Sequence, residues 1–151
     1  MPQSLSKILV QVVFSTKNRE PFLDSPAVCA EMHRYLGGVC KTLDCPSLTV
    51  GGAADHVHLL VNLARTVAIA DLVKESKRVS SQWIKTRGVQ YAKFEWQRGY
   101  GAFSVGQSQI EEVRRYIERQ PEHHRRVTFQ EEFRRFLEKY RIECDERYVW
   151  D

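Results

Sequence analysis

The sequence has little that would mark a secreted, membrane-bound or zinc-finger protein. Its cysteines, Cys29, Cys40, Cys45 and Cys144, form no Cys-x-x-Cys pair and show no metal-finger spacing. No apolar run approaches the roughly 20 residues of a membrane span. The first residues, 1–7, lack the apolar core and small-residue cleavage site of a signal peptide. We therefore expect a cytoplasmic protein with no membrane partner, whose cysteines stay reduced.

The charge balance does not point strongly to one class of partner either. Lys and Arg number 23 against 19 Asp and Glu, a formal net charge of +4. This mild excess is compatible with a polyanionic partner without requiring one. The 151 residues are 42% hydrophobic and 28% charged, which suits a globular chain with a core of its own. No linker, repeat or low-complexity stretch interrupts them, so we expect residues 1–151 to form a single domain.

What the sequence does contain is an alternating segment, DHVHLLVNL at residues 55–63, that reads as a strand. Successive side chains of a strand point to opposite faces, so His56 and His58 share one face and the other face is purely apolar. Two imidazoles at this spacing can reach one metal ion. His-x-His also occurs by chance on half-exposed strands, and the motif alone does not decide between these alternatives.

The other segments complete a recognisable order of strand, helix, strand, strand, helix, strand and two further helices. The residues expected in these elements are 7–15, 25–43, 47–50, 55–63, 66–88, 100–105, 108–120 and 128–140. This order is the split β-α-β, ferredoxin-like plan, an α+β fold with a four-stranded antiparallel sheet and both long helices on one face. The two added helices would begin at capping boxes, Ser108 with Glu111 and Thr128 with Glu131. Since the apolar face of the histidine strand packs on the long helices, its histidines should point to the open face of the sheet.

A tyrosine and a glutamine stand four residues apart on the helix expected to begin at Ser108. Tyr116 and Gln120 should project the same way. By position alone, Tyr116 could equally be an amphipathic residue at the edge of a core stripe. A tyrosine, an amide oxygen and two imidazoles are nonetheless a coherent chemical set. Gln120 and the histidines could hold a divalent cation, and Tyr116 could attack a phosphodiester in line and become linked as a phosphotyrosine.

Five segments of the chain carry a family resemblance. They lie at residues 13–19, 55–61, 99–105, 116–124 and 129–133. Together and in this order they resemble the single-tyrosine HUH transposases of small insertion sequences and the related REP-associated tyrosine transposases. The resemblance implies that His56, His58 and Gln120 are metal ligands for Mg²⁺ or Mn²⁺ and that Tyr116 is the nucleophile.

The resemblance also implies partners. Members of the family cleave single-stranded DNA at element ends and recognise a nearby DNA hairpin. Many are homodimers that pair the histidines of one subunit with the tyrosine helix of the other, so we expect a homodimer with shared sites. The alternative is a monomer whose helix folds over its own sheet. His123 and His124 lie in a matching segment, and we expect them only at the surface or ordering a loop.

Basic and aromatic residues gain a candidate partner from the resemblance, although a basic helix face taken alone is usually just solvated. Trp96 and Tyr100 could stack on unpaired bases. The candidate DNA-binding residues are Lys17, Arg19, Lys74, Lys77, Arg78, Trp96 and Tyr100. Further cationic residues that could contact DNA are Arg114, Arg115, Arg119, Arg125 and Arg126.

The sequence thus predicts a DNA transposase that cleaves and rejoins single-stranded DNA through a 5′-phosphotyrosine and recognises DNA hairpins at element ends. Two alternatives stay open. One is a domesticated endonuclease that acts on REP-like hairpins. The other is a ferredoxin-like nucleic-acid-binding module without catalysis, whose histidines are satisfied structurally.

Overall fold

The computed structural model describes residues 2–151 and contains a four-stranded antiparallel sheet. The strands are β1 (Leu9–Ser15), β2 (Ser47–Ala53), β3 (His56–Asn62) and β4 (Gly101–Val105), in the order β2-β3-β1-β4. The helices are α1 (Pro26–Thr42), α2 (Ile69–Lys85), α3 (Ile110–Glu118), α4 (Gln120–His123) and α5 (Phe129–Lys139). Short 3₁₀ turns lie at Lys17–Arg19, Val89–Tyr91 and Gln107–Gln109. The ferredoxin-like α+β prediction is confirmed.

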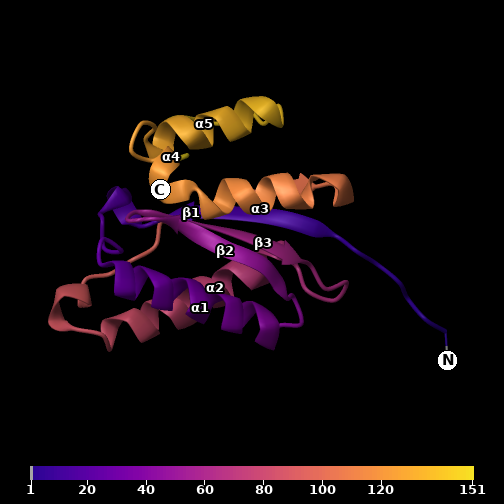
Figure 1. Cartoon of the computed structure of the whole chain (residues 1–151), viewed down its shortest axis with the longest axis horizontal. Coiled ribbons are helices and arrows are strands. Elements are labelled where there is room, and N and C mark those ends of the chain that lie inside the picture. The colour runs from indigo at the N-terminus through magenta and orange to yellow at the C-terminus, as the bar shows by residue number, and fades with distance from the viewer. Residues whose placement is uncertain (1) are drawn as a thin grey trace.

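Helices cover both faces of the sheet, with α1 and α2 on one side and α3, α4 and α5 on the other (Figure 1). On the first side, the apolar side chains of β3 pack with those of β1 and with the stripes of the two long helices. This core contains Val57, Leu59 and Val61 of β3, all at most 1% exposed. The alternation of the histidine strand therefore buries its apolar face as predicted. No helix within residues 2–151 is both long and apolar enough to cross a membrane.

The second face of the sheet is not open, which corrects one expectation. Helix α3 lies against β2 and β3, and the phenylalanine stripe of α5 packs on Phe103 of β4 and Val13 of β1. These helices are strongly amphipathic and have to bury their apolar stripes somewhere, and the sheet face is where they do so. As a result His56 and His58 are 0% exposed.

Two of the predicted helix starts are confirmed and one is wrong. Helix α1 begins after Ser25, whose Oγ accepts a hydrogen bond from the Val28 N–H at 3.5 Å. Helix α5 begins after Thr128, whose Oγ1 accepts from the Glu131 N–H at 3.1 Å. Ser108 makes no cap, because it lies inside the 3₁₀ turn that precedes α3.

The tyrosine helix is broken where the sequence predicted a continuous one. Helix α3 ends at Glu118 and α4 begins at Gln120, so Tyr116 and Gln120 lie on different helices joined at Arg119. Pro121 sits in the first turn of α4, where its missing N–H costs no helical hydrogen bond. The break turns Gln120 inward, and its side chain is fully buried.

The last residues dock on the fold. Val149 and Trp150 pack against the cluster formed by α5 and β4. The backbone oxygen of Asp151 accepts hydrogen bonds from the N–H groups of Arg98 and Gly99 at 2.6 and 3.0 Å. Hydrogen bonds therefore hold the last residues against the segment that precedes β4.

Gly51 of β2 sets how closely α3 approaches the sheet. A Cβ atom at this position would lie 2.7 Å from both Cγ2 and the backbone oxygen of Ile117. Real Cβ atoms do not approach other atoms so closely, so a larger residue would push α3 away from the strand. Ile117 directly follows Tyr116, and the position of the tyrosine therefore depends on this glycine.

We predict that Gly51→Ala destabilises the protein by about 1–3 kcal/mol, the usual cost of overpacking a tight interface. The control is Gly38→Ala in α1, where a Cβ would meet nothing within 4 Å. Alanine there should be neutral or stabilise the helix by up to about 1 kcal/mol. Urea unfolding of both variants measures the difference. Equal stabilities would contradict the proposed contact between α3 and β2.

Candidate active site

Strand β3 carries His56 and His58 on one face, and each ring is held from behind. His56 Nδ1 lies 2.8 Å from Asp55 Oδ1, and His58 Nδ1 lies 3.0 Å from Gln11 Nε2. The ring centroids are 5.1 Å apart. These contacts fix the ring orientations and aim both Nε2 atoms at the space beneath α3 and α5. Hydrogen bonds behind the rings are a usual feature of metal-binding histidines.

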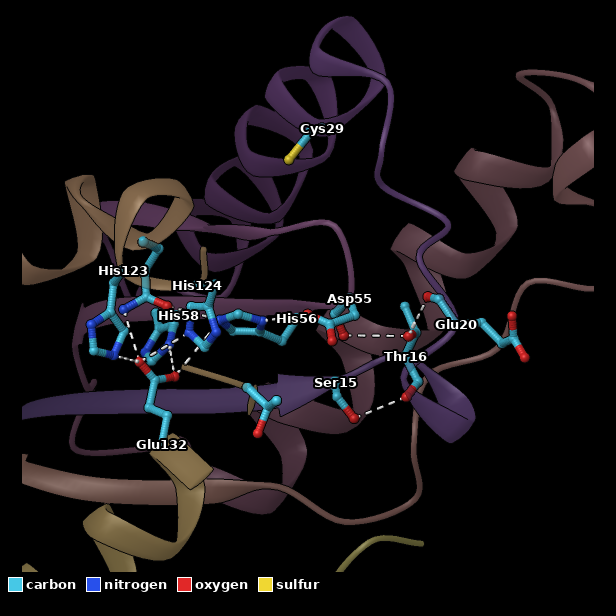
Figure 2. A network of polar contacts seen from close by, with 12 residues as sticks. Ser15, Thr16, Glu20, Cys29, Asp55, His56, His58, His123, His124 and Glu132 are labelled. Carbon is cyan, nitrogen blue, oxygen red and sulfur yellow. Dashed lines mark hydrogen bonds and ion pairs between the residues drawn. The ribbon is translucent and has the colours of Figure 1, made fainter. Parts of the chain in front are cut away.

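The centre of the site is a glutamate, Glu132, that was not among the predicted site residues. Glu132, in the first turn of α5, is 1% exposed. Its Oε1 lies 2.9 Å from His58 Nε2 and 3.7 Å from His56 Nε2 (Figure 2). Its Oε2 accepts hydrogen bonds from the Tyr116 hydroxyl and, at 3.0 Å, from Gln120 Nε2. One carboxylate therefore joins the histidine strand to the tyrosine and glutamine.

Two further histidines surround this carboxylate. His124 Nε2 lies 3.1 Å and His123 Nε2 3.3 Å from Glu132 Oε2 (Figure 2). His124 stacks edge-on against His56, with ring centroids 4.2 Å apart, and its side chain is 8% exposed. His124 is therefore part of the buried site, in contrast to the surface role expected for it.

The buried cluster could hold a metal ion. His56, His58, His124 and Glu132 each offer one ligand atom, and these atoms all lie within 4.8 Å of one another. Gln120 Oε1 also lies 2.8 Å from His56 Nε2. All four residues predicted for the reaction, His56, His58, Tyr116 and Gln120, thus meet in one place, and all come from the same chain.

Burial and charge set the protonation states of the site. Burial lowers the pKa of His58 to about 4 against the opposing effect of Glu132, so the ring is neutral at pH 7 and can bind a metal. Burial alone would raise the pKa of Glu132. Its contacts with His124 and His58 outweigh that effect and hold the pKa well below its usual range. Burial and the Glu132 charge raise the pKa of Tyr116 far above its ordinary value. The site therefore places a protonated phenol beside an ionised carboxylate.

A basic groove leads to Tyr116. It has a volume of about 1000 Å³, and its walls include Arg115, Arg119, Arg125 and Arg126. Glu112 and Glu122 also line it, so the positive charge is partly balanced. A polyanionic chain lying in this groove would pass directly over the tyrosine.

A second basic groove, of about 860 Å³, lies along α2 on the other side of the sheet. Six of the predicted DNA-binding residues line it, namely Lys17, Lys74, Lys77, Arg78, Trp96 and Tyr100. Arg19 does not, because its guanidinium donates to the Trp150 backbone oxygen at 3.2 Å. The sequence therefore located a basic surface to which six of the seven candidates contribute.

Trp96 and Lys77 serve the fold. Trp96 is 8% exposed, its Nε1 donates to Ser80 Oγ at 2.9 Å, and its ring packs edge-on against Phe14. It presents no free face for a base. Lys77 Nζ donates to the backbone oxygens of residues 97, 98 and 99, and burial lowers its pKa to about 8. Both side chains face inward because the segment before β4 folds across α2.

The remaining candidates are more accessible. Lys17 pairs with Glu95 at 3.0 Å, and Arg78 pairs with Glu75, both at exposed positions where ion pairs exchange readily. Tyr100 is 39% exposed. Lys74 makes no ion pair within residues 2–151. These side chains are free to meet a ligand in the groove.

The fold and the site together define a ferredoxin-like protein with a buried histidine and glutamate cluster beside a tyrosine. A family model described as "Transposase IS200 like" matches residues 4–120. The chain therefore belongs to the IS200-like transposase family. A comparison with curated proteins finds no match.

Two solved structures share the fold. One is a Deinococcus radiodurans R1 protein provisionally assigned as a transposase, with a TM-score of 0.62 and 20% identity over 80% of this chain and 96% of that one. The other is a REP-associated tyrosine transposase bound to a REP hairpin, with a TM-score of 0.59 and 15% identity. That likeness covers 91% of this chain and 86% of the other.

Proposed function

We propose that this protein is a DNA transposase that cleaves and rejoins single-stranded DNA through a phosphotyrosine. The observation that carries the proposal is the hydrogen bond from the Tyr116 hydroxyl to Glu132, whose other oxygen faces His56 and His58. We also propose that residues 1–151 form one HUH transposase domain. Helix α5, beyond the residues matched by the family model, supports this by supplying Glu132.

The residues fit a divalent metal ion. Imidazole nitrogens and a carboxylate lie within reach of one ion, the Gln120 amide oxygen lies beside His56 Nε2, and the buried His124 Nε2 makes no hydrogen bond within residues 2–151. We propose His56, His58 and Gln120 as ligands of Mg²⁺ or Mn²⁺. Mixed nitrogen and oxygen ligands suit Mn²⁺ better than Mg²⁺, which prefers an octahedron of oxygens. When bound, such an ion polarises the scissile phosphodiester and stabilises charge on the leaving oxygen.

In the proposed reaction, Tyr116 is the nucleophile. Its phenolic oxygen forms a bond to the scissile phosphorus while the bond from phosphorus to the 3′ oxygen breaks. The phenol proton passes to Glu132, to which it is already hydrogen-bonded. The departing 3′ oxygen takes up a proton from solvent, and the 5′ phosphate stays on Tyr116. Attack by a 3′ hydroxyl on this linkage then joins strands and restores the tyrosine without ATP.

The basic grooves support a nucleic-acid partner. We propose that the groove beside Tyr116 receives the strand to be cut and that the groove along α2 contacts a DNA hairpin. Phosphate contacts by Lys and Arg would position the DNA in both. The likeness to a transposase bound to a REP hairpin favours a second candidate function, a domesticated endonuclease for REP-like hairpins. Palindromic element ends beside the gene would favour the transposase, and scattered extragenic palindromes the endonuclease.

A homodimer stays a prediction, but the shared active site is not needed to complete the chemistry. Tyr116 and Gln120 contact Glu132 and His56 of their own chain. We propose that each subunit holds a complete site. This corresponds to the alternative in which the tyrosine helix folds over the sheet of its own subunit. The arrangement of the site would be the same in a monomer and in a dimer.

We predict that His56→Ala or His58→Ala abolishes metal-dependent cleavage of a hairpin-bearing oligonucleotide and leaves hairpin binding nearly intact. The reason is that the histidines hold the metal ion that acts on the scissile phosphate, while hairpin binding depends on phosphate contacts elsewhere in the protein. His33→Ala in α1 is the matched control and should cleave normally, because His33 contacts Cys29 outside the site. Gel cleavage and binding assays give the two readouts.

Normal cleavage by His56→Ala or His58→Ala would remove these residues from the reaction. Tight hairpin binding by the wild-type protein, with no cleavage in Mg²⁺ or Mn²⁺, would instead support the non-catalytic binding module.

We predict that replacing Lys74 and Arg78 with Ala weakens hairpin binding and lowers its salt dependence. For each phosphate that the variant no longer neutralises, the slope of log affinity against log salt should fall by about 1. Lys41→Ala is the control, since this exposed lysine of α1 lines neither groove. Binding titrations at several salt concentrations measure the slopes. An unchanged slope in the double variant would show that this helix face is merely solvated.

A further inference from the structure

We infer that Glu132 and His124 are metal ligands in addition to the two histidines of β3. The inference rests on the proposed function, because it assigns further ligands to the same metal centre. It changes the chemical nature of that centre, since a negatively charged ligand from α5 joins a set that was otherwise neutral.

The geometry places the Glu132 oxygen among the donors of the strand. Oε1 lies 2.9 Å from His58 Nε2 and 3.7 Å from His56 Nε2, so the three atoms face one common point. The imidazoles reach this point with their Nε2 atoms because Asp55 and Gln11 contact the Nδ1 atoms behind them. Two imidazoles and one carboxylate around a common point form a recurrent site for first-row divalent metals.

Charge gives a second, independent argument. His56, His58 and Gln120 are neutral ligands at fully buried positions. A divalent cation held by them alone would keep its whole charge in a site shielded from water, which is costly. Glu132 brings one negative charge into the same space. Within residues 2–151, its ion-pair partners are all histidines, with no lysine or arginine among them.

His124 completes the set. Its Nε2 atom is buried, lies 3.1 Å from Glu132 Oε2 and makes no hydrogen bond within residues 2–151. Buried polar atoms normally have hydrogen-bond partners, so a buried imidazole nitrogen held only by this ion-pair contact, among the other ligand atoms, needs an explanation. A metal ion shared with His56, His58 and Glu132 supplies one. His123 differs, because its side chain is 29% exposed and it lies outside this ligand cluster.

Metal ligation by Glu132 would also affect the tyrosine. Glu132 would face the metal with Oε1 while Oε2 accepts the hydrogen bonds of Tyr116 and Gln120. Metal binding and the position of the nucleophile would then depend on the same carboxylate. The ligand set also favours Mn²⁺ or Fe²⁺ over Mg²⁺, because imidazoles and a carboxylate suit the transition metals.

The test is calorimetric titration of the DNA-free protein with Mn²⁺, which measures metal affinity apart from activity. Glu132→Gln keeps the shape of the side chain and removes its charge, and we expect it to weaken Mn²⁺ binding at least tenfold. His124→Ala should also weaken binding measurably. Glu138→Gln, an exposed glutamate on the same helix, is the matched control and should bind like the wild type. His56→Ala should lose binding, and circular dichroism shows whether each variant is folded.

Wild-type Mn²⁺ affinity in folded Glu132→Gln and His124→Ala, with binding lost in His56→Ala, would overturn this inference. The centre of His56, His58 and Gln120 and the proposed function would then both stand. If Glu132→Gln fails to fold, His124→Ala decides the matter alone. A wild-type protein that binds no Mn²⁺ and cleaves no hairpin DNA would overturn the inference and the proposed function together.

Discussion

A single buried carboxylate, that of Glu132, links the parts of this structure on which the site depends. It belongs to α5, yet its partners come from β3, α3 and the short α4. An ionised carboxylate that is 1% exposed must find partners for its oxygens inside the protein. It finds them in His58, Tyr116 and Gln120, and this requirement fixes how the C-terminal helices lie on the sheet.

The two faces of the sheet are therefore held by different forces. Under α1 and α2 the core is mostly apolar, with side chains such as Phe14 and Leu59 fully or almost fully buried. Ser76 and Ser80 of α2 are the polar side chains buried there among the described residues of that helix. Under α3 and α5 the packing is divided. Phenylalanines of α5 cover β4 and part of β1, while a polar network covers β3. Such a network stabilises the fold only when every member has a partner. A metal ion would complete it by binding the buried His124 Nε2, which makes no hydrogen bond within residues 2–151.

Tyr116 stands at the boundary between this network and solvent. It is only partly buried, and the basic groove beside it is open. Under the proposed function, the strand to be cut would approach Tyr116 from this groove. Gly51 allows this arrangement, because a side chain at that position would separate α3 from β2.

The sequence predicted those features that depend on local periodicity. Alternation identified β3 and placed His56 and His58 on one face, the expected range 25–43 began at the start of α1, and a capping box located the start of α5. It did not predict that this face is covered, because periodicity shows that a helix has an apolar stripe but not which surface the stripe meets. It also missed the break at Arg119, where a helix of favourable composition ends so that Gln120 can turn inward.

The sequence around Glu132 does indicate that this residue is buried. It lies within the apolar stripe of its helix, three residues after Phe129 and one before Phe133, both of which are buried. A charged residue in such a stripe must be buried with partners, and the histidines were the natural candidates. The sequence around Trp96 does not indicate whether this side chain is buried. A tryptophan before a strand reads the same whether it meets a DNA base or, as here, Ser80 and Phe14.

In the proposed function, one chain brings together every group that the cleavage needs. The most direct test mixes inactive His56→Ala protein with inactive Tyr116→Phe protein and measures cleavage of a hairpin-bearing oligonucleotide. Co-expression with different tags and joint purification would ensure that any dimers contain both variants. The account predicts that cleavage stays absent, because no chain in the mixture has both the histidine pair and the tyrosine. Recovery of cleavage in the mixed sample would contradict it, since activity could then arise only from a site shared between subunits.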